Sequence, residues 1–192
     1  MEKKFENVCQ FKIVLEESKS MIWRRVLVPE TYTFWDLHVT IQDAMGWENY
    51  HMHEFETVNH STKEIITIKT PEWEQLIADF LDMDNPLAHY IYDFGDSWGH
   101  IIKLENIVPV EKDVNYPICI NGKGACPPED CGGVWGYEEL LEIIKNPDHE
   151  EYEEMLEWVG ENFDPEYFDP KNVVFSDPTD HMNDLLNFDE NY

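Results

Sequence analysis

Positive charge is scarce in this chain. Of its 192 residues, 13 are lysine or arginine and 41 are aspartate or glutamate, so the formal net charge is −28 at neutral pH. Residues 1–110 contain nine basic and 19 acidic residues, and residues 111–192 contain four and 22. Proteins bind nucleic acids largely through lysine and arginine contacts to phosphates, so this composition argues against direct nucleic-acid binding. It argues equally against binding to anionic membranes. The acidic surface is either a solvated, self-repelling coat that keeps the protein in solution or a face for a basic protein partner, and the coat is the more common case.

Long apolar runs are also missing. No segment approaches the about 18 consecutive apolar residues that are needed to span a bilayer. The charged N-terminus is not followed by the apolar stretch of a secretory signal. The four cysteines have neither the paired C-x2-C spacing of a zinc knuckle nor the pattern of a disulfide framework. We therefore expect a cytoplasmic protein.

Several common enzyme signatures do not occur. There is no G-x-x-x-x-G-K-S/T phosphate loop, no G-x-G-x-x-G, no H-E-x-x-H and no G-x-S-x-G. Nucleotide-binding folds with these loops and serine hydrolases of the G-x-S-x-G type are therefore disfavoured.

The residues that are present form a globular pattern, with 42% hydrophobic and 14% aromatic content. Alternation and apolar stripes predict strands at 8–16, 21–28, 51–58, 64–69, 88–94 and 98–107, and helices at 33–46, 137–145 and 148–159, with another that starts at Thr70-Pro71. The predicted fold class is α+β: a largely antiparallel or mixed sheet with helices packed on it and a helix-rich C-terminal third. We expect one domain over 1–176 and an acidic, weakly ordered tail over 177–192, with one helical turn near 182–186.

Two adjacent arginines lie on the second predicted strand. Arg24 and Arg25 point to opposite faces, and each has apolar neighbours on its own face. A buried arginine needs a carboxylate or carbonyl partner. Because acidic residues are abundant, at least one buried arginine–carboxylate pair is expected.

Two histidines, His51 and His53, are two residues apart on another predicted strand. Residues at this spacing face the same way, so both imidazoles could reach one metal ion or one anion. Two such histidines on an edge strand are also common without a ligand.

The clearest hairpin joins Tyr92 to His100 through a turn rich in glycine and aspartate. A turn on Asp96-Ser97 would place Asp93 opposite His100, as in a carboxylate-oriented histidine. A three-residue loop would instead pair Tyr92 with His100. The alternative to a functional role is that His100 is hydrogen-bonded within the fold.

The loop Cys126-Pro127-Pro128-Glu129-Asp130-Cys131-Gly132-Gly133 is stiffened by prolines and ends on flexible glycines. It would hold Glu129 and Asp130 in a defined place. Cys126 and Cys131 could be metal ligands, packing groups or a redox pair, although C-x4-C is not a recognised zinc spacing. In the alternative without chemistry, one acid caps a backbone turn and the other meets Arg24 or Arg25.

These segments resemble a known family. The runs concerned are Ile22-Trp23-Arg24-Arg25-Val26, Ala44-Met45-Gly46-Trp47, His51-Met52-His53-Glu54-Phe55, Tyr92-Asp93-Phe94-Gly95-Asp96-Ser97-Trp98-Gly99-His100, the Cys126–Gly133 loop and Phe163-Asp164-Pro165-Glu166-Tyr167-Phe168-Asp169. In this order, across roughly residues 8–176, they are similar to the plasmid pRiA4b open-reading-frame-three-like family. The resemblance implies an α+β domain and no particular activity. Some relatives carry labels that link them to mobile elements. The scarcity of basic residues here does not support the direct DNA binding that such a label suggests.

Three hypotheses for function follow. The leading one is a binding or interaction module with a polar, aromatic-walled cleft. Its candidate residues are Arg24, Arg25, Asp93, Asp96, Trp98, His100, Glu129 and Asp130. The second is a metal-dependent enzyme, for example a hydrolase, that binds a divalent metal. Its candidate ligands are His51, His53, His100, Cys126 and Cys131 with nearby carboxylates. The third is an accessory protein of a mobile-element or DNA-processing system that acts through protein contacts.

Overall fold

Seven antiparallel strands form one sheet in the order β4-β3-β5-β6-β1-β2-β7. The computed structural model describes residues 4–160 and 162–189. The strands are β1 (Asn7–Leu15), β2 (Trp23–Pro29), β3 (His53–Val58), β4 (Ile65–Thr67), β5 (Leu87–Tyr92), β6 (Trp98–Pro109) and β7 (Ile118–Lys123). With the helices described next, this architecture confirms the predicted α+β class with an antiparallel sheet.

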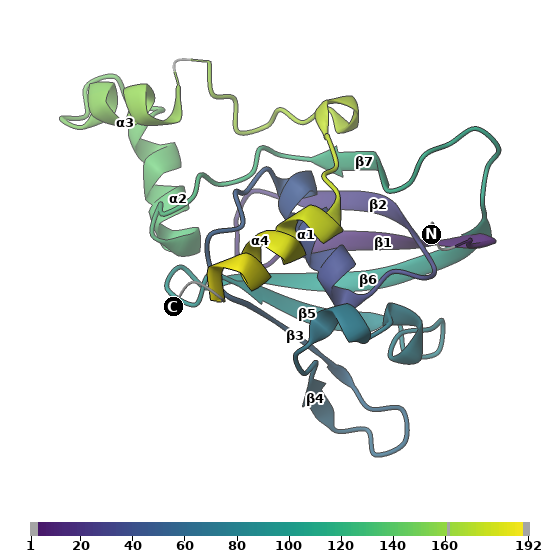
Figure 1. The fold of residues 1–192 in the computed structure, drawn as a ribbon. Coiled ribbons are helices and arrows are strands. Elements are labelled where there is room, and N and C mark those ends of the chain that lie inside the picture. Colours follow the sequence, from purple (N-terminus) through teal and green to yellow (C-terminus); the bar gives the residue numbers. More distant parts are fainter. Residues whose placement is uncertain (1–3, 161, 190–192) are drawn as a thin grey trace.

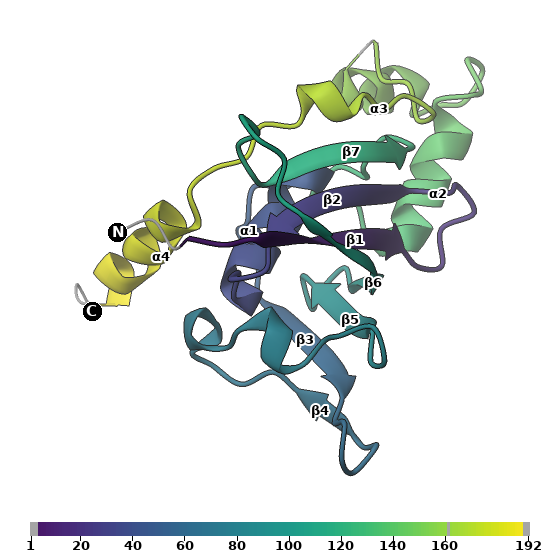
Figure 2. The same ribbon diagram turned by 90° about the vertical axis from the view of Figure 1, so that its right-hand side faces the viewer.

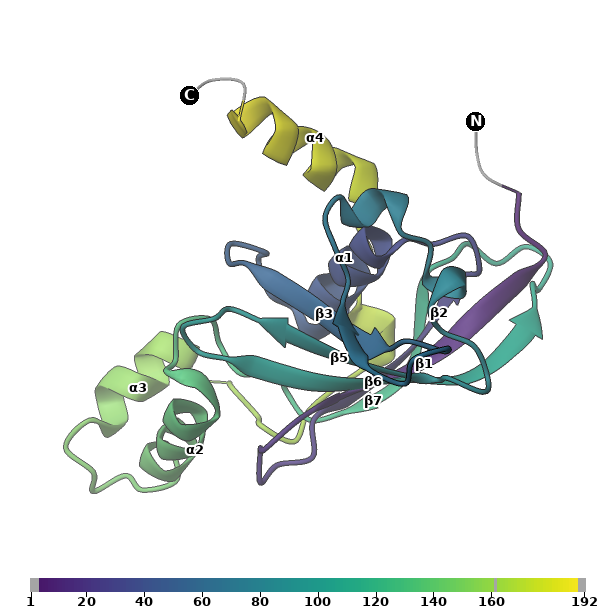
Figure 3. The same ribbon diagram turned by 90° about the horizontal axis from the view of Figure 1, so that it is seen from below.

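The helices are α1 (Phe34–Met45), α2 (Gly133–Ile143), α3 (Tyr152–Val159) and α4 (Pro178–Asp189), together with the 3-10 turns η1 (Glu72–Glu74), η2 (Ile77–Asp79) and η3 (Pro170–Asn172). Helix α1 lies across the sheet, and α4 lies in front of α1 (Figure 1). Figures 2 and 3 show α1 and α4 on the same side of the sheet, with α2 and α3 beyond one end of the strands. No helix in the described part of the chain is long and apolar enough to span a membrane.

The core forms between the sheet and α1. Alternate residues of β1, such as Phe11 and Ile13, are fully buried, as the period of two requires. Helix α1 covers them with its apolar stripe, whose buried members include Leu37 and Ile41. The spacing of Thr33 and Asp36 predicts a capping box at the start of α1, and the structure confirms it. The Thr33 hydroxyl accepts a hydrogen bond from the Asp36 amide, and the Asp36 carboxylate accepts one from the Thr33 amide.

The helix predicted to begin at Thr70-Pro71 is wrong. The segment forms only the short turns η1 and η2. Trp73, which a helical stripe with Leu76 and Ile77 would bury, is 38% exposed. Its acidic residue Glu72 is instead 6% exposed and lies 2.8 Å from the imidazole of His53. The contact between Glu72 and His53, which is distant in the sequence, thus replaces the helix that the local pattern predicts.

Strand β7 was not predicted. Its sequence, Ile118 to Lys123, has little hydrophobic alternation, and it overlaps the segment 121–136, whose glycines and prolines predict a loop. The strand exists because it pairs with β2, for example Asn121 with Arg25. Near the C-terminus, the single predicted turn is instead the twelve-residue helix α4, and the indole of Trp35 donates a hydrogen bond to the carbonyl of Pro178 at its start. The domain boundary after residue 176 stays a prediction.

Candidate functional site

The loop between β5 and β6 is longer than either predicted turn. Tyr92 pairs with Trp98 and Tyr90 pairs with His100, so residues 93–97 form the connection. Both predicted partners of His100, Asp93 and Tyr92, are therefore wrong. Asp93 and Ser97 have φ of 54° and 58°, and the Ser97 amide donates to the Asp93 carbonyl over 2.6 Å. Aspartate tolerates this left-handed conformation better than most residues, and it turns the Asp93 side chain out of the ladder.

Trp98 and His100 belong to the core. Both are 0% exposed, and the His100 ring lies 5.4 Å from the ring of Trp47 and 5.5 Å from that of Tyr90. Burial lowers the pKa of His100 to about 3, so its imidazole is neutral at physiological pH. The predicted cleft wall of Trp98 and His100 is therefore wrong, and His100 is not at the surface to bind a metal with His51.

His51 is surrounded by carboxylates. Its Nε2 lies 3.4 Å from Asp130 Oδ1, 3.7 Å from Asp93 Oδ2 and 4.0 Å from Glu129 Oε2. One ligand atom each from His51, Asp93 and Asp130 fits within a mutual distance of 4.8 Å. Within the described residues, His51 Nε2 makes none of these contacts as a hydrogen bond. The imidazole and the acids thus converge on a common space.

Two of these carboxylates are oriented by their other oxygen. Asp93 Oδ1 accepts a hydrogen bond from the Gly95 amide over 2.8 Å, which leaves Oδ2 toward His51. Glu129 Oε1 accepts from the Glu48 amide over 2.8 Å, which leaves Oε2 toward His51. Such outer contacts fix the direction of a metal-ligating group.

Tyr92 links two of the segments that meet here. Its hydroxyl donates to Glu129 Oε1 over 3.1 Å and accepts from the amide of Tyr50 over 3.1 Å. Burial and the Glu129 carboxylate raise the pKa of Tyr92, so the phenol stays protonated and remains a donor.

The loop over residues 126–133 is held at two points, one on Trp47 after α1 and one on the hairpin loop at Asp96. The indole of Trp47 donates to the Pro127 carbonyl over 3.0 Å, and Asp96 Oδ2 accepts from the Gly132 amide over 3.1 Å. The latter bond uses the Asp96 side chain, so Asp96 anchors the loop, and within the described residues it is not among the carboxylates paired with His51. At Asp130, φ is 56°, and this conformation helps to present the carboxylate.

His53 points to a different place from His51. It begins β3, pairs with Glu72 and stacks on His38, with the two ring centroids 3.4 Å apart and the planes 5° apart. The prediction that His51 and His53 share a ligand is therefore wrong. The physical reason is that His51 precedes the strand, so the alternation of strand side chains does not relate the two.

A directed chain of hydrogen bonds supports the segment that carries His51. The Gln42 amide donates to the Tyr90 hydroxyl over 2.9 Å, and this hydroxyl lies 2.8 Å from His38 Nδ1. The hydroxyl then donates its proton to Nδ1, and Nε2–H donates to Asn49 Oδ1 over 2.6 Å. Burial lowers the pKa of His38 and keeps its ring neutral, as this sequence of hydrogen bonds requires.

The two arginines lie away from His51. Arg25 forms a bidentate pair with Glu105, with N···O distances of 2.6 and 3.0 Å, but both side chains are partly exposed. Arg24 is 1% exposed and bonds to carbonyl oxygens, not to a carboxylate. The expected buried arginine–carboxylate pair is therefore wrong, and neither Glu129 nor Asp130 meets an arginine among the described residues.

The cysteines do not join the cluster around His51. Burial raises the pKa of Cys131 to about 12 and raises that of Cys126, so both thiols are protonated. Among the described residues, the one group of three or more potential ligands that is close enough for a metal ion contains no cysteine. Cys126 and Cys131 pack against the core instead.

Sequence reasoning missed Tyr92 and Glu48 as parts of this site. The pattern predicts that Tyr92 is a core residue of a strand, and the residue is indeed 0% exposed. Its hydroxyl nevertheless reaches Glu129. Glu48 contributes only its backbone amide, which no side-chain pattern reveals. The available signal was the dense run of polar residues beside Tyr92, which marked the hairpin but not its contacts.

Residues 7–172 match the model of the family described as plasmid pRiA4b ORF-3-like protein. The chain is 36% identical over 163 residues to the uncharacterised protein y4hQ of Sinorhizobium fredii (strain NBRC 101917 / NGR234), which covers 80% of this chain and 81% of y4hQ. It also matches the crystal structure of MM3350, a protein of unknown function from Methanosarcina mazei Go1. That match has a TM-score of 0.86 and 49% identity and covers 90% of this chain and 100% of MM3350.

Proposed function

The chain belongs to the plasmid pRiA4b ORF-3-like family, and within that family we propose that it binds a divalent cation through His51, Asp93 and Asp130. The observation that carries this proposal is the convergence of their ligand atoms within 4.8 Å. With Glu129, three carboxylates surround one imidazole at 3.4 to 4.0 Å. A cation between them would offset the mutual repulsion of these acids.

The spacing fits a first-row metal. Ligand atoms about 2.1 Å from a tetrahedral metal are about 3.4 Å apart, close to the distances from His51 Nε2 to Asp130 and Asp93. Glu129 stands slightly farther away, at 4.0 Å, and is tied to Tyr92. One imidazole with carboxylates suits Mn²⁺, Fe²⁺ or Zn²⁺ better than Mg²⁺ or Cu⁺.

The arrangement leaves room for chemistry. His51 is 31% exposed and Asp130 75% exposed at the side chain, so the cluster opens to solvent. A metal held by three protein groups with an open position acts as a Lewis acid or activates water. Glu129 would then stand beside the metal as a carboxylate that can accept a proton. A metal-dependent enzyme would therefore use His51, Asp93 and Asp130 as ligands and Glu129 as the proton acceptor.

Metal titration followed by calorimetry tests the proposal. We expect the protein to bind one equivalent of Mn²⁺ or Zn²⁺, and H51A to weaken this binding at least tenfold because it removes the only nitrogen ligand. D93N should weaken it too. An asparagine oxygen can still accept from the Gly95 amide, so the turn is retained while the charge is lost. Y92F should lower the metal affinity about tenfold, because the Tyr92 hydroxyl orients Glu129.

His60 provides the matched control. Its Nε2 lies 3.7 Å from Asp82 Oδ2, a distance like that in the site, but among the described residues His60 has only this one carboxylate beside it. H60A should leave the metal affinity unchanged. Absence of binding by the wild-type protein, or binding that H51A and D93N leave intact, would refute the assignment.

Charge suggests what else meets this surface. The excess of 41 acidic over 13 basic residues favours a basic protein as partner and disfavours direct nucleic-acid binding. An accessory role in a DNA-processing system would therefore use protein contacts. The four cysteines are free, which supports the proposed cytoplasmic location because thiols stay reduced there.

A further inference from the structure

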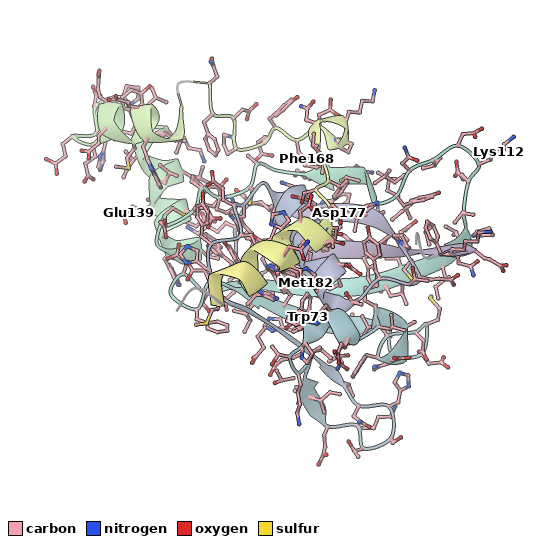
Figure 4. All side chains as sticks on the ribbon, in the orientation of Figure 1. Trp73, Lys112, Glu139, Phe168, Asp177 and Met182 are labelled. Atoms are coloured by element: carbon pink, nitrogen blue, oxygen red, sulfur yellow. The ribbon has the colours of Figure 1, made fainter. Side chains whose placement is uncertain are left out.

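A cavity lies between the C-terminal end of α1 and the segment around η3. Its volume is about 230 Å³, and its lining includes Arg24, Asp43, Cys126, Phe168 and Asp169. Figure 4 labels Phe168, which lies beside β7. None of the lining residues takes part in the His51 cluster.

Arg24 is the buried charge of this cavity. Its Nε donates to the Ala44 carbonyl over 2.8 Å, and its Nη1 donates to the carbonyls of Trp23 and Lys123, each over 3.0 Å. Nη2 donates no hydrogen bond to the described residues, and it is not among their fully buried, unpartnered atoms. The remaining two donors of the guanidinium therefore reach the cavity.

This buried cation has no anionic partner in the described part of the chain. Burial lowers the pKa of Arg24, which reflects the free-energy cost of holding the charge there. Buried charges in proteins are normally paired. An unpaired one is notable in a chain with 41 acidic residues.

Phe168 positions the guanidinium. The ring centroid lies 3.7 Å from the Arg24 Cζ, a close cation–π contact. The ring also rests on Gly122, where a Cβ atom would lie 2.3 Å from Phe168 Cε1. Gly122 thus allows the ring to sit where it holds Arg24 in one orientation.

Two carboxylates complete the lining. Asp43 Oδ2 accepts hydrogen bonds from the amide and hydroxyl of Ser176, over 2.8 and 2.9 Å. Asp169 Oδ1 accepts from the Lys171 amide over 3.0 Å. Each acid is therefore fixed through one oxygen, while the other oxygen makes no recorded bond within the described residues. The C-terminal end of α1, at Ala44 and Met45, adds further partial negative charge.

We infer that this cavity binds a small zwitterion that carries one carboxylate and one ammonium group, as a free α-amino acid does. An oxygen of the carboxylate would accept a charge-assisted hydrogen bond from Nη2 of Arg24, because Nε and Nη1 already donate to carbonyls. The ammonium group would face Asp43 and Asp169. The volume lies below the about 300–1,000 Å³ of sites for drug-sized ligands, which limits the ligand to a small molecule of amino-acid size.

A simple anion fits these charges less well. It would meet Arg24 but also Asp43, Asp169 and the negative end of α1, within a protein of net charge −28. A simple cation would meet the buried guanidinium. A zwitterion satisfies both ends and brings no net charge, so it is the class that the lining selects.

Calorimetric titration of the full chain with L-leucine and L-lysine tests the inference. 4-Methylpentanoate and 3-methylbutylamine, which are leucine without its amine and without its carboxylate, serve as matched probes. We expect saturable binding of at least one amino acid and binding of the two half-molecules at least tenfold weaker, the effect of one charge-assisted hydrogen bond. R24M should abolish amino-acid binding.

A second variant keeps the test informative if R24M does not fold, since Arg24 also supports three carbonyls. D43N/D169N removes the charges but leaves amide oxygens that can keep the bonds to Ser176 and Lys171, and it should weaken amino-acid binding about tenfold or more. R25M is the control, because Arg25 lies on the opposite face of β2 and pairs with Glu105. The inference is overturned if neither amino acid binds, if 4-methylpentanoate binds as tightly as leucine, or if D43N/D169N leaves the affinity unchanged. Arg24 would then be a structural group at the end of α1.

Discussion

Gly133 lies against the backbone of the hairpin loop at Asp96. Its φ is +69°, and a Cβ atom there would lie 2.4 Å from the Asp96 carbonyl oxygen. Both obstacles belong to the backbone, which cannot rotate away as a side chain can. G133A should therefore separate the loop from the hairpin and disturb Glu129 and Asp130 together.

The expected loss of stability has two parts. An alanine in the left-handed region costs about 1–2 kcal/mol. Steric overlap in a packed region adds about 1–3 kcal/mol. G133A should thus lower the free energy of unfolding by about 2–5 kcal/mol, a large share of the about 5–15 kcal/mol that is typical of a domain.

Urea unfolding measures this loss, and Gly46 supplies the control. Gly46 has φ of +93°, but a Cβ atom there would meet nothing within 4 Å. G46A should therefore lose only the conformational part, about 1–2 kcal/mol. If G133A and G46A lower the unfolding free energy equally, the close approach of Asp96 does not constrain the loop. G133A should also weaken Mn²⁺ binding more than G46A does.

Two further predictions concern charge. His100 is neutral in the fold, with a pKa of about 3 against about 6.5 when unfolded, so the unfolded chain binds an extra proton below pH 6.5. H100F should therefore reduce the loss of stability on acidification, measured in chelator, by up to about 1.4 kcal/mol per pH unit; an unchanged pH slope would contradict this. The partly exposed Arg25–Glu105 pair should contribute about 0.5–1 kcal/mol, less at high salt, in a double-mutant cycle with R25A and E105A. A coupling energy near zero at low salt would contradict it.

The candidate site shows which functional residues the sequence pattern could identify. Asp93, Glu129 and Asp130 were identified because polar residues gather beside glycines and prolines, where the backbone leaves regular structure. His51 was identified for a different reason, its spacing from His53, and the structure gives it other neighbours. The sequence thus identified the residues of the site but not which of them lie together.

His100 and Glu72 explain why grouping fails. His100 was a candidate for the wall of a cleft and Glu72 lay at the start of a predicted helix, yet each is buried, His100 among aromatic rings and Glu72 against His53. Burial of a polar group depends on a partner or a packing environment that lies far away in the chain. Local periodicity contains no information on that partner.

The amino-acid sequence by itself determined the α+β class, most of the strands, the capped helix α1 and the acidic character, because these depend on local periodicity, capping and composition. The tertiary structure decided the five-residue hairpin loop, the pairing that creates β7, and the separation of His51 from His53. It also decided that Arg24 faces a cavity lined by Asp43 and Asp169 while Arg25 meets Glu105. Each of these outcomes rests on contacts between residues distant in the chain, whose energies exceed the local preferences of the segments they join.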